Sequence, residues 1–225
     1  MKRVVIPELL DSDAGTPREI SDSLADLRMI NRFFGGARTM AGLLAEIADR
    51  RQLKSISWLD VAGASGDIAA LATEALAEKG IALKPVLLDR SAAHLNGKFP
   101  SVCGDALALP FRDNSFDVVG SSLFVHHLEP PEIAAFMREA LRVAHQAVVI
   151  NDLIRNPVHL ALIYAGRAVY RSRLTRHDAV ASVRRAYTVE EIRNLLGQTG
   201  AAEIEIKRFF LFRMGVIAWK RPATT

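Results

Sequence analysis

The sequence predicts a single α/β domain with a mostly parallel sheet that helices cover on both faces. Apolar runs of strand length alternate with helix-length segments through the middle of the chain, which is typical of parallel sheets. A turn of small residues joins the first of these strands to a helix. Near the C-terminus, two short runs predict an antiparallel pair at the edge of the sheet.

Two helices are expected before the first strand. Residues 1–20 are predicted to be irregular, because proline and glycine interrupt every apolar pattern there. Apolar side chains at helical spacing predict a helix over 21–34. Gly35-Gly36 interrupts this pattern, and a second helix is predicted over 38–51.

The alternating region supplies the strands of the predicted sheet and the helices that cover it. Four strand-like runs are expected, at 57–61, 85–89, 116–121 and 147–151. Helices are predicted between them, at 68–79 and 131–143, with a shorter helical segment at 91–95.

The last third of the chain is expected to add a helical lid and the edge strands. One amphipathic helical run is predicted over 157–174, within a segment that would lie above the strand ends. Thr188 is predicted to cap a helix that closes near Gly200, before strands at 204–206 and 216–219. The single domain, 1–225, then divides into an N-terminal helical segment, a cofactor-binding core, the lid, and a final helix with the edge strands: 1–55, 56–152, 153–187 and 188–225.

Composition excludes several classes of protein. A chain of 225 residues, half of them hydrophobic, can bury one full core. The single Cys103 excludes a disulfide framework and a cysteine-rich metal site, and we expect no metal centre. There is no signal-peptide pattern and no apolar run of about 20 residues that would span a membrane. We therefore expect a cytoplasmic protein without stable membrane insertion.

The net charge of +4 is unevenly distributed. Residues 151–225 carry seven more basic than acidic side chains, whereas residues 1–150 carry three more acidic than basic ones. A solvated arginine-rich helix face is sufficient to explain this excess. Attraction of an anionic or membrane-associated substrate is the alternative. No nucleic-acid-binding motif accompanies the basic residues, so no nucleic-acid partner is expected.

Three short motifs at the ends of successive strands predict a site for a nucleotide-like ligand. The turn from Asp60 to Asp67 is built of small residues, which lets the backbone approach a ligand beside the first N–H groups of a helix. Asp89 ends the next strand, where a carboxylate can bind ribose hydroxyls, although it also suits an ordinary turn. Asp105 and Ala106 begin the third connection, where they can meet an adenine ring or form a simple turn.

These motifs resemble those of class I S-adenosylmethionine-dependent methyltransferases, over at least residues 56–151. The run Leu59-Asp-Val-Ala-Gly-Ala-Ser-Gly-Asp67 is similar to the Asp-x-Ala-Gly-Gly-Thr-Gly-Asp turn of the menaquinone- and ubiquinone-biosynthesis enzymes, and resembles small-molecule methyltransferases more widely. The segment from Gly104 to Val119 and the run His126-His127-Leu128 match the same pattern. Ala64 departs from it, because glycine is usual at this position. The resemblance implies a Rossmann-like, seven-stranded sheet and S-adenosyl-L-methionine as the cofactor.

The resemblance also implies roles for individual residues. The methionine part of the cofactor would lie against the turn after the first strand, the ribose at Asp89, the adenine at Asp105, and the sulfonium near the end of the fourth strand. The cofactor-binding residues implied in this way are Asp60, Ala62, Gly63, Gly66, Asp89, Arg90, Asp105, Ala106, Ser121 and Ser122.

Three further residues are candidates for the chemistry of transfer. A hydroxyl acceptor needs a base, and histidine suits this task near neutral pH. His126 and His127 lie beyond the fourth strand, and in a regular segment only one of the two would face the cavity. Asp152, after the fifth strand, can orient a histidine or bind the acceptor. Packing remains the alternative for all three.

The predicted function is methyl transfer to a small aromatic acceptor, phenolic or quinol-like, most simply at oxygen. Methylation of a ring carbon is the nearest alternative, since an ionised phenol already places charge on carbon. A catalytically weak cofactor-binding protein is the alternative that Ala64 leaves open. The sequence indicates neither the oligomeric state nor the identity of the acceptor.

Overall fold

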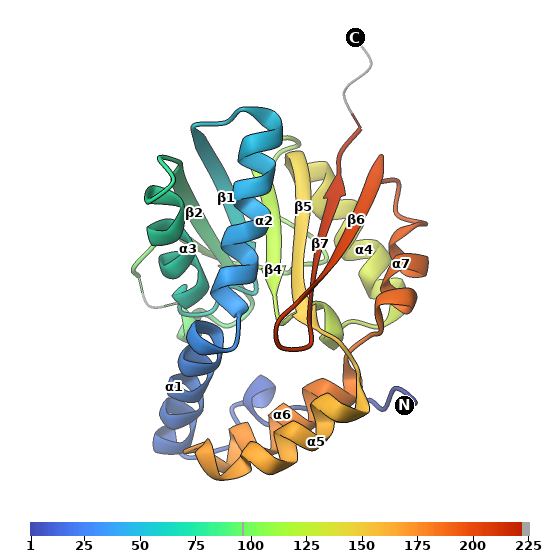
Figure 1. Ribbon diagram of the computed structural model, residues 1–225. Coiled ribbons are helices and arrows are strands. Elements are labelled where there is room, and N and C mark those ends of the chain that lie inside the picture. Colours follow the sequence, from blue (N-terminus) through green and yellow to red (C-terminus); the bar gives the residue numbers. More distant parts are fainter. Residues whose placement is uncertain (96, 222–225) are drawn as a thin grey trace.

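The computed structural model describes residues 1–95 and 97–221, and its strands form one seven-stranded sheet (Figure 1). The strand order is β3-β2-β1-β4-β5-β7-β6, and β7 alone runs against the others. This confirms the Rossmann-like, mostly parallel sheet with an antiparallel pair at its edge. The strands are β1 (Ser55–Val61), β2 (Ala82–Asp89), β3 (Ser101–Cys103), β4 (Phe116–Ser122), β5 (Ala144–Leu153), β6 (Glu203–Phe209) and β7 (Arg213–Trp219).

Helices cover both faces of this sheet and the ends of its strands. The helices are α1 (Pro17–Phe33), α2 (Gly36–Arg51), α3 (Asp67–Ala77), α4 (Pro130–Val143), α5 (Pro157–Ala165), α6 (Arg173–Arg185) and α7 (Val189–Leu196). Short 3-10 turns occur at η1 (Leu10–Ser12), η2 (Ala92–His94), η3 (Val125–His127) and η4 (Gly166–Val169). None of the helices in the described part of the chain has the length and apolarity needed to cross a bilayer.

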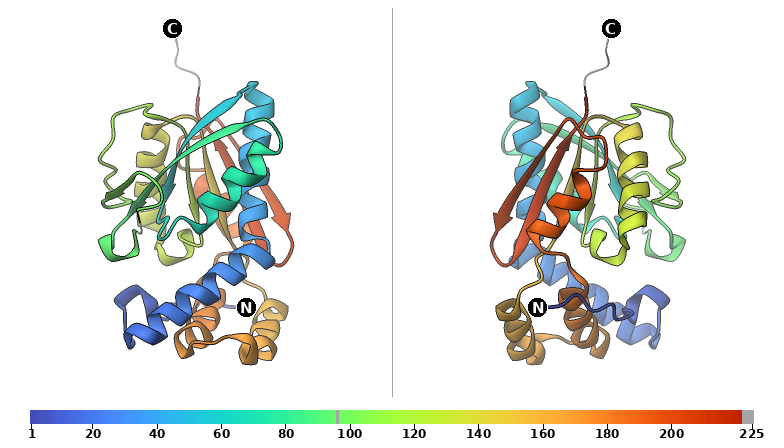
Figure 2. Two further views of the ribbon diagram at one scale, coloured as in Figure 1. Left: turned by 90° about the vertical axis from the view of Figure 1, so that its left-hand side faces the viewer. Right: turned by 90° about the vertical axis from the view of Figure 1, so that its right-hand side faces the viewer.

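Two apolar clusters hold the helices against the sheet. Helices α2 and α3 pack on one face, around the fully buried Trp58. Helices α4 and α7 pack on the other face, around the fully buried Phe136. A third group, α1, α5 and α6, lies below the carboxyl ends of the parallel strands in Figure 1, and Figure 2 shows the N-terminal segment beside α6. This third layer is the predicted N-terminal and lid material.

Strand β3 is the strand that the sequence did not locate. It has three residues, and each of them keeps part of its side chain exposed. A run this short shows neither alternation nor a continuous apolar pattern, so its pairing with β2 decides its conformation.

The first helix begins earlier than predicted, because Pro17 starts it instead of preventing it. Thr16 and Glu19 form a reciprocal capping box: the Thr16 side chain accepts from the Glu19 N–H, and the Glu19 carboxylate accepts from the Thr16 N–H. Proline suits the first helical position, where its missing N–H would have no partner within the helix. Residues 1–20 are therefore not irregular throughout.

The single helical run predicted over 157–174 is in fact two helices. Helix α5 ends at Ala165, and α6 begins at Arg173 after the N-cap Ser172. The backbone N–H groups of Arg171 and Ser172 both donate to the buried Asp26 carboxylate of α1, at 2.9 and 3.1 Å. The lid is thus broken where it is fastened to the N-terminal helix. The Thr188 cap, by contrast, is confirmed, with Glu191 as its reciprocal partner.

Candidate functional site

A cavity of about 870 Å³ lies between the carboxyl ends of the parallel strands and the α1, α5 and α6 layer. The chain passes from β1 to β2 and β3 on one side, and from β4 to β5 on the other. A parallel sheet opens at such a switch point, because the two connections leave in opposite directions. The fold therefore places the main cavity where the ends of β1 and β4 meet.

The turn after β1 forms one wall of this cavity. The Gly63 N–H donates to the Leu88 carbonyl at 3.2 Å, and a Cβ on Gly63 would meet the Asp60 carbonyl oxygen at 3.0 Å. Ala62 and Ala64 both have left-handed backbones, with φ of 59° and 44°. Gly66 is also left-handed, with φ of 71°, and begins α3 without lining the cavity. Glycine would suit position 64 because L residues disfavour this conformation.

We expect Ala64→Gly to stabilise the protein by about 0.5–1 kcal/mol, because relief of the left-handed strain exceeds the entropic cost of glycine. Chemical denaturation of the cofactor-free protein measures this change. The matched control is Ala70→Gly, inside α3, which should instead destabilise the protein by about 1 kcal/mol. A loss of stability at position 64 comparable with that at position 70 would contradict the strain argument.

The Asp89 carboxylate connects the turn after β1 with the loop after β2. One of its oxygens accepts from the Ala64 N–H at 3.0 Å, and the other from the Ser91 N–H at 2.9 Å. The Asp89 carbonyl accepts from the Gly104 N–H at 3.0 Å, which brings the third loop alongside. Asp105 is exposed and accepts from the Leu107 N–H at 2.9 Å. The three predicted motifs therefore lie next to one another in the same wall of the cavity.

Asp60 is a buried carboxylate at the base of this wall. It is 2% exposed, and its Oδ1 has no hydrogen-bond partner within the described chain. Burial, and then the neighbouring Asp89 carboxylate, raise the pKa of Asp60 to about 8. A buried polar oxygen without a partner indicates a place where a polar or cationic ligand group would be stabilising.

Asp60→Asn is expected to make the cofactor-free protein more stable than wild type above pH 8. The folded protein holds a proton on Asp60 that the unfolded chain has lost, so wild-type stability falls as the pH rises from about 4 to about 8. Asparagine cannot ionise and avoids this loss. Thermal unfolding at pH 4 and pH 9 measures the difference, which should grow with pH; a difference independent of pH would contradict the raised pKa.

His126 and His127 lie side by side on the opposite wall, in the turn η3. Their ring centroids are 4.2 Å apart, and both rings line the cavity. The expectation that only one of them faces the cavity is therefore wrong, because the 3-10 turn does not alternate its side chains as a strand does. His126 Nδ1 lies 2.7 Å from Asp152 Oδ1, and the His126 N–H donates to Asp152 Oδ2 at 2.9 Å. Asp152 thus orients His126 from beneath the cavity wall.

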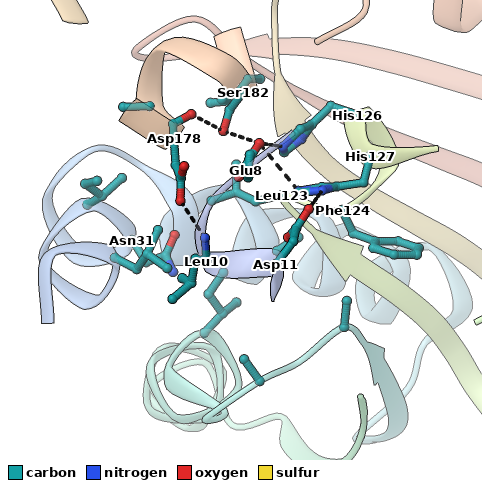
Figure 3. A pocket seen from close by; sticks show the side chains of 18 of the residues that line it. Glu8, Leu10, Asp11, Asn31, Leu123, Phe124, His126, His127, Asp178 and Ser182 are labelled. Atoms are coloured by element: carbon teal, nitrogen blue, oxygen red, sulfur yellow. Dashed lines mark hydrogen bonds and ion pairs between the residues drawn. The ribbon is translucent and has the colours of Figure 1, made fainter. Parts of the chain in front are cut away.

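Two acidic residues of the N-terminal segment reach the histidine pair (Figure 3). Glu8 Oε1 lies 3.4 Å from His126 Nε2 and 3.8 Å from His127 Nε2. Asp11 Oδ2 lies 3.0 Å from His127 Nδ1. Figure 3 shows Glu8 pointing between the two imidazoles and Ser182 of α6, whose hydroxyl donates to it at 2.7 Å.

The carboxylates dominate the electrostatics of this cluster. Burial alone would lower the pKa of His126, but Asp152 and Glu8 raise it to about 10. Burial would likewise raise the pKa of Glu8 and of Asp152, and the paired imidazoles hold both below their ordinary values. His126 therefore carries a positive charge at neutral pH while Glu8 is in place, and in that state it cannot accept a proton.

The structure brings most of the predicted site residues to the cavity. Those that line it are Asp60, Ala62, Gly63, Asp89, Arg90, Asp105, Ala106, Ser122, His126 and His127. Gly66, Ser121 and Asp152 lie behind the lining. Ser121 is fully buried and its Oγ has no partner in the described chain, while the adjacent Ser122 faces the cavity.

The sequence did not single out Glu8 or Asp11 as site residues. Both precede the first helix in a stretch without a periodic pattern, so only their contacts with residues far along the chain identify them. Arg213 of β7 was also missed; it is 1% exposed, lines the cavity, and donates to the Phe34 carbonyl at 2.9 Å.

The lid contributes apolar side chains to the cavity wall. Among the aromatic residues of the lid segment, His159 and Tyr170 line the cavity, whereas Tyr187 packs in the core and donates its hydroxyl to the Leu128 carbonyl. Apolar side chains from α1, α5 and the loops complete the lining: Leu27, Ile30, Phe34, Leu123, Phe124, Leu162 and Ile163.

Comparisons with known proteins agree with this arrangement. Residues 59–150 match a protein family described as a methyltransferase domain. No curated protein matches the sequence significantly. Many solved structures share the fold at low identity.

Three of these structures indicate the range of the likeness. The plantazolicin methyltransferase BpumL, in complex with a triazolic desmethylPZN analogue and S-adenosylhomocysteine, is 15% identical with a TM-score of 0.67, over 95% of this chain and 94% of that one. The magnesium protoporphyrin IX methyltransferase of Synechocystis PCC 6803, with bound S-adenosylhomocysteine, is 15% identical with a TM-score of 0.53, over 83% and 84%. A proposed O-methyltransferase from Nostoc punctiforme PCC 73102 is 16% identical with a TM-score of 0.62; 91% of this chain aligns, spanning 60% of the other.

Proposed function

We propose that this chain, whose residues 59–150 match a methyltransferase domain, is a class I S-adenosylmethionine-dependent methyltransferase that methylates the oxygen of a small phenolic or quinol-like acceptor. The observation that carries this proposal is the histidine pair beside the apolar side chains that α1 and α5 contribute to the cavity. An aromatic ring would be bound by the apolar wall, and its hydroxyl would find polar partners at His126, His127 and Glu8. A wholly polar acceptor would make few favourable contacts with these apolar side chains.

The other wall fits the cofactor. The unpartnered Asp60 oxygen suits a cationic amino group. A side chain at position 63 would crowd the Asp60 carbonyl oxygen, so glycine keeps this turn compact. We assign Asp60, Ala62 and Gly63 to the methionine part, with Gly66 shaping the turn, Asp89 and Arg90 to the ribose, Asp105 and Ala106 to the adenine, and Ser121 and Ser122 to the neighbourhood of the sulfonium. When bound, S-adenosylmethionine supplies a methyl group on a sulfonium that leaves as a neutral thioether.

The residues of the acceptor end orient the hydroxyl and remove its proton. His127 offers Nε2 to the cavity while Asp11 binds its Nδ1, so His127 is the residue best placed to take the proton as the oxygen–methyl bond forms. His126, fixed by Asp152, contributes positive charge beside the developing oxyanion. The proton then passes from His127 to solvent, and the products are the methyl ether and S-adenosylhomocysteine.

Incubation with methyl-labelled cofactor and a panel of phenols and quinols tests the proposal. The expected result is label on oxygen, with apolar ring substituents improving turnover. Label on a ring carbon would overturn O-methylation and favour C-methylation. Cofactor binding without transfer to any member of the panel would overturn the acceptor class.

A further inference from the structure

We propose that Glu8, His126 and His127 form a binding site for one divalent transition-metal ion of the Zn²⁺ type. Their donor atoms, one from each side chain, all lie within 4.8 Å of one another. Two imidazole nitrogens and one carboxylate oxygen are a common ligand set for such ions. The inference deepens the proposed function, because the site lies at the acceptor end of the same cavity.

The spacing of the donor atoms suits a small ion. Zinc–nitrogen bonds of about 2.0–2.1 Å place tetrahedral donor atoms about 3.3 Å apart. Glu8 Oε1 and His126 Nε2 are already 3.4 Å apart, and Glu8 Oε1 and His127 Nε2 are 3.8 Å apart. His126 is fixed in the core, whereas His127 is 20% exposed and has room to adjust. A small rotation of His127 would complete the site.

The groups behind the two histidines are arranged as in metal sites. Asp152 lies 2.7 Å from Nδ1 of His126, and Asp11 lies 3.0 Å from Nδ1 of His127. Because an ionised carboxylate only accepts hydrogen bonds, each Nδ1 carries a proton, and each Nε2 is the atom that can bind an ion, which at His126 displaces the Nε2 proton of the charged imidazole. Outer carboxylates of this kind fix the tautomer and orientation of metal-binding histidines. Here both histidines have one.

A second observation points independently to a ligand. His126 is 2% exposed, and its Nε2 makes no hydrogen bond within the described chain, although the Glu8 carboxylate lies 3.4 Å away as an ion-pair partner. Three carboxylates, from Glu8, Asp11 and Asp152, surround the two imidazoles. A bound cation would lie between Glu8 Oε1 and the two Nε2 atoms, with Asp11 and Asp152 behind the rings. No metal centre was expected because the chain has a single cysteine, but the ligands proposed here do not include cysteine.

The proposed ion would add a function to the acceptor end. Three protein ligands leave a coordination position open, and an acceptor oxygen bound there would lose its proton more readily. In the metal-bound enzyme His127 would be a ligand instead of the base, and the hydroxyl bound to the ion would release its proton to solvent. This role rests on the proposed function, whereas the binding of the ion does not.

Titration of chelator-treated protein with Zn²⁺ alone, and separately with Co²⁺ followed by visible absorption, tests the site. We expect one ion per chain. His127→Ala and Glu8→Gln should each weaken binding at least tenfold, and Asp11→Asn about tenfold through loss of the outer partner. His94→Ala, in the same cavity, and His145→Ala, which is exposed on β5, are the matched controls and should leave the affinity unchanged.

Circular dichroism and thermal unfolding of every variant exclude loss of fold as the cause. The proposal would be overturned if His127→Ala and Glu8→Gln bound the ion as tightly as the wild type does. It would also be overturned if the folded wild-type protein bound no ion. Neither result would touch the proposed function, since the titration contains no cofactor and no acceptor. Conversely, failure of the acceptor panel would leave a measured ion site intact.

Discussion

His127→Ala is expected to lower kcat about 100-fold or more while changing KM much less, because proton transfer by a positioned base contributes at least this factor. His127 lines the acceptor end of the cavity, and Asp11 holds its other nitrogen. Alanine removes the imidazole that would receive the proton or bind the proposed ion. Steady-state kinetics with the best acceptor from the panel measures the effect.

Two further variants separate chemistry from structure at this position. Asp11→Asn keeps the side-chain shape and should lower kcat less than His127→Ala does, since it disturbs only the orientation of the imidazole. His145→Ala removes an exposed histidine outside the cavity and should leave kcat unchanged. A folded His127→Ala enzyme with wild-type kcat would show that the histidine serves packing alone.

Asp89→Ala is expected to raise the dissociation constant of S-adenosylmethionine about 10- to 100-fold, because hydrogen bonds to a charged group contribute about 1.5–3 kcal/mol each. The same carboxylate binds the Ala64 and Ser91 N–H groups, so its removal also releases the turn after β1. Isothermal titration calorimetry with the cofactor and with S-adenosylhomocysteine measures both affinities.

The controls for Asp89 distinguish the lost carboxylate from a general change in charge. Asp113→Ala removes an exposed carboxylate paired with Arg142, outside the cavity, and should not alter cofactor affinity. Asp89→Asn keeps one oxygen acceptor and should fall between the wild type and the alanine variant. Equal affinity for the wild type and Asp89→Ala would refute the ribose assignment.

The sheet was predictable because its central strands, β1, β4 and β5, are largely buried and helix-length segments separate the parallel strands. Its least predictable strand, β3, is three residues long and partly exposed, so its sequence carries no periodic pattern. The ends of helices were less predictable for a related reason. Pro17 and Ser172 act as cap residues, and the break between α5 and α6 depends on hydrogen bonds to Asp26 of another helix.

The sequence by itself determined the half of the cavity that we assign to the cofactor. Asp60, Asp89 and Asp105 each follow a strand or precede a loop in a short continuous motif, and the parallel sheet brings the strand ends together without further information. Even the departure at Ala64 was visible in the sequence, although only the backbone showed that this residue is left-handed.

Only the tertiary structure decided the half that we assign to the acceptor. Glu8 and Asp11 meet His126 and His127 because the N-terminal segment crosses the cavity, where Leu9 and Leu10 donate their N–H groups to Asp178 of α6. These contacts join parts of the chain that are distant in sequence, and no local propensity specifies them. The physical reason is that a motif within one segment fixes its own geometry, whereas a cluster drawn from three segments exists only once they have packed.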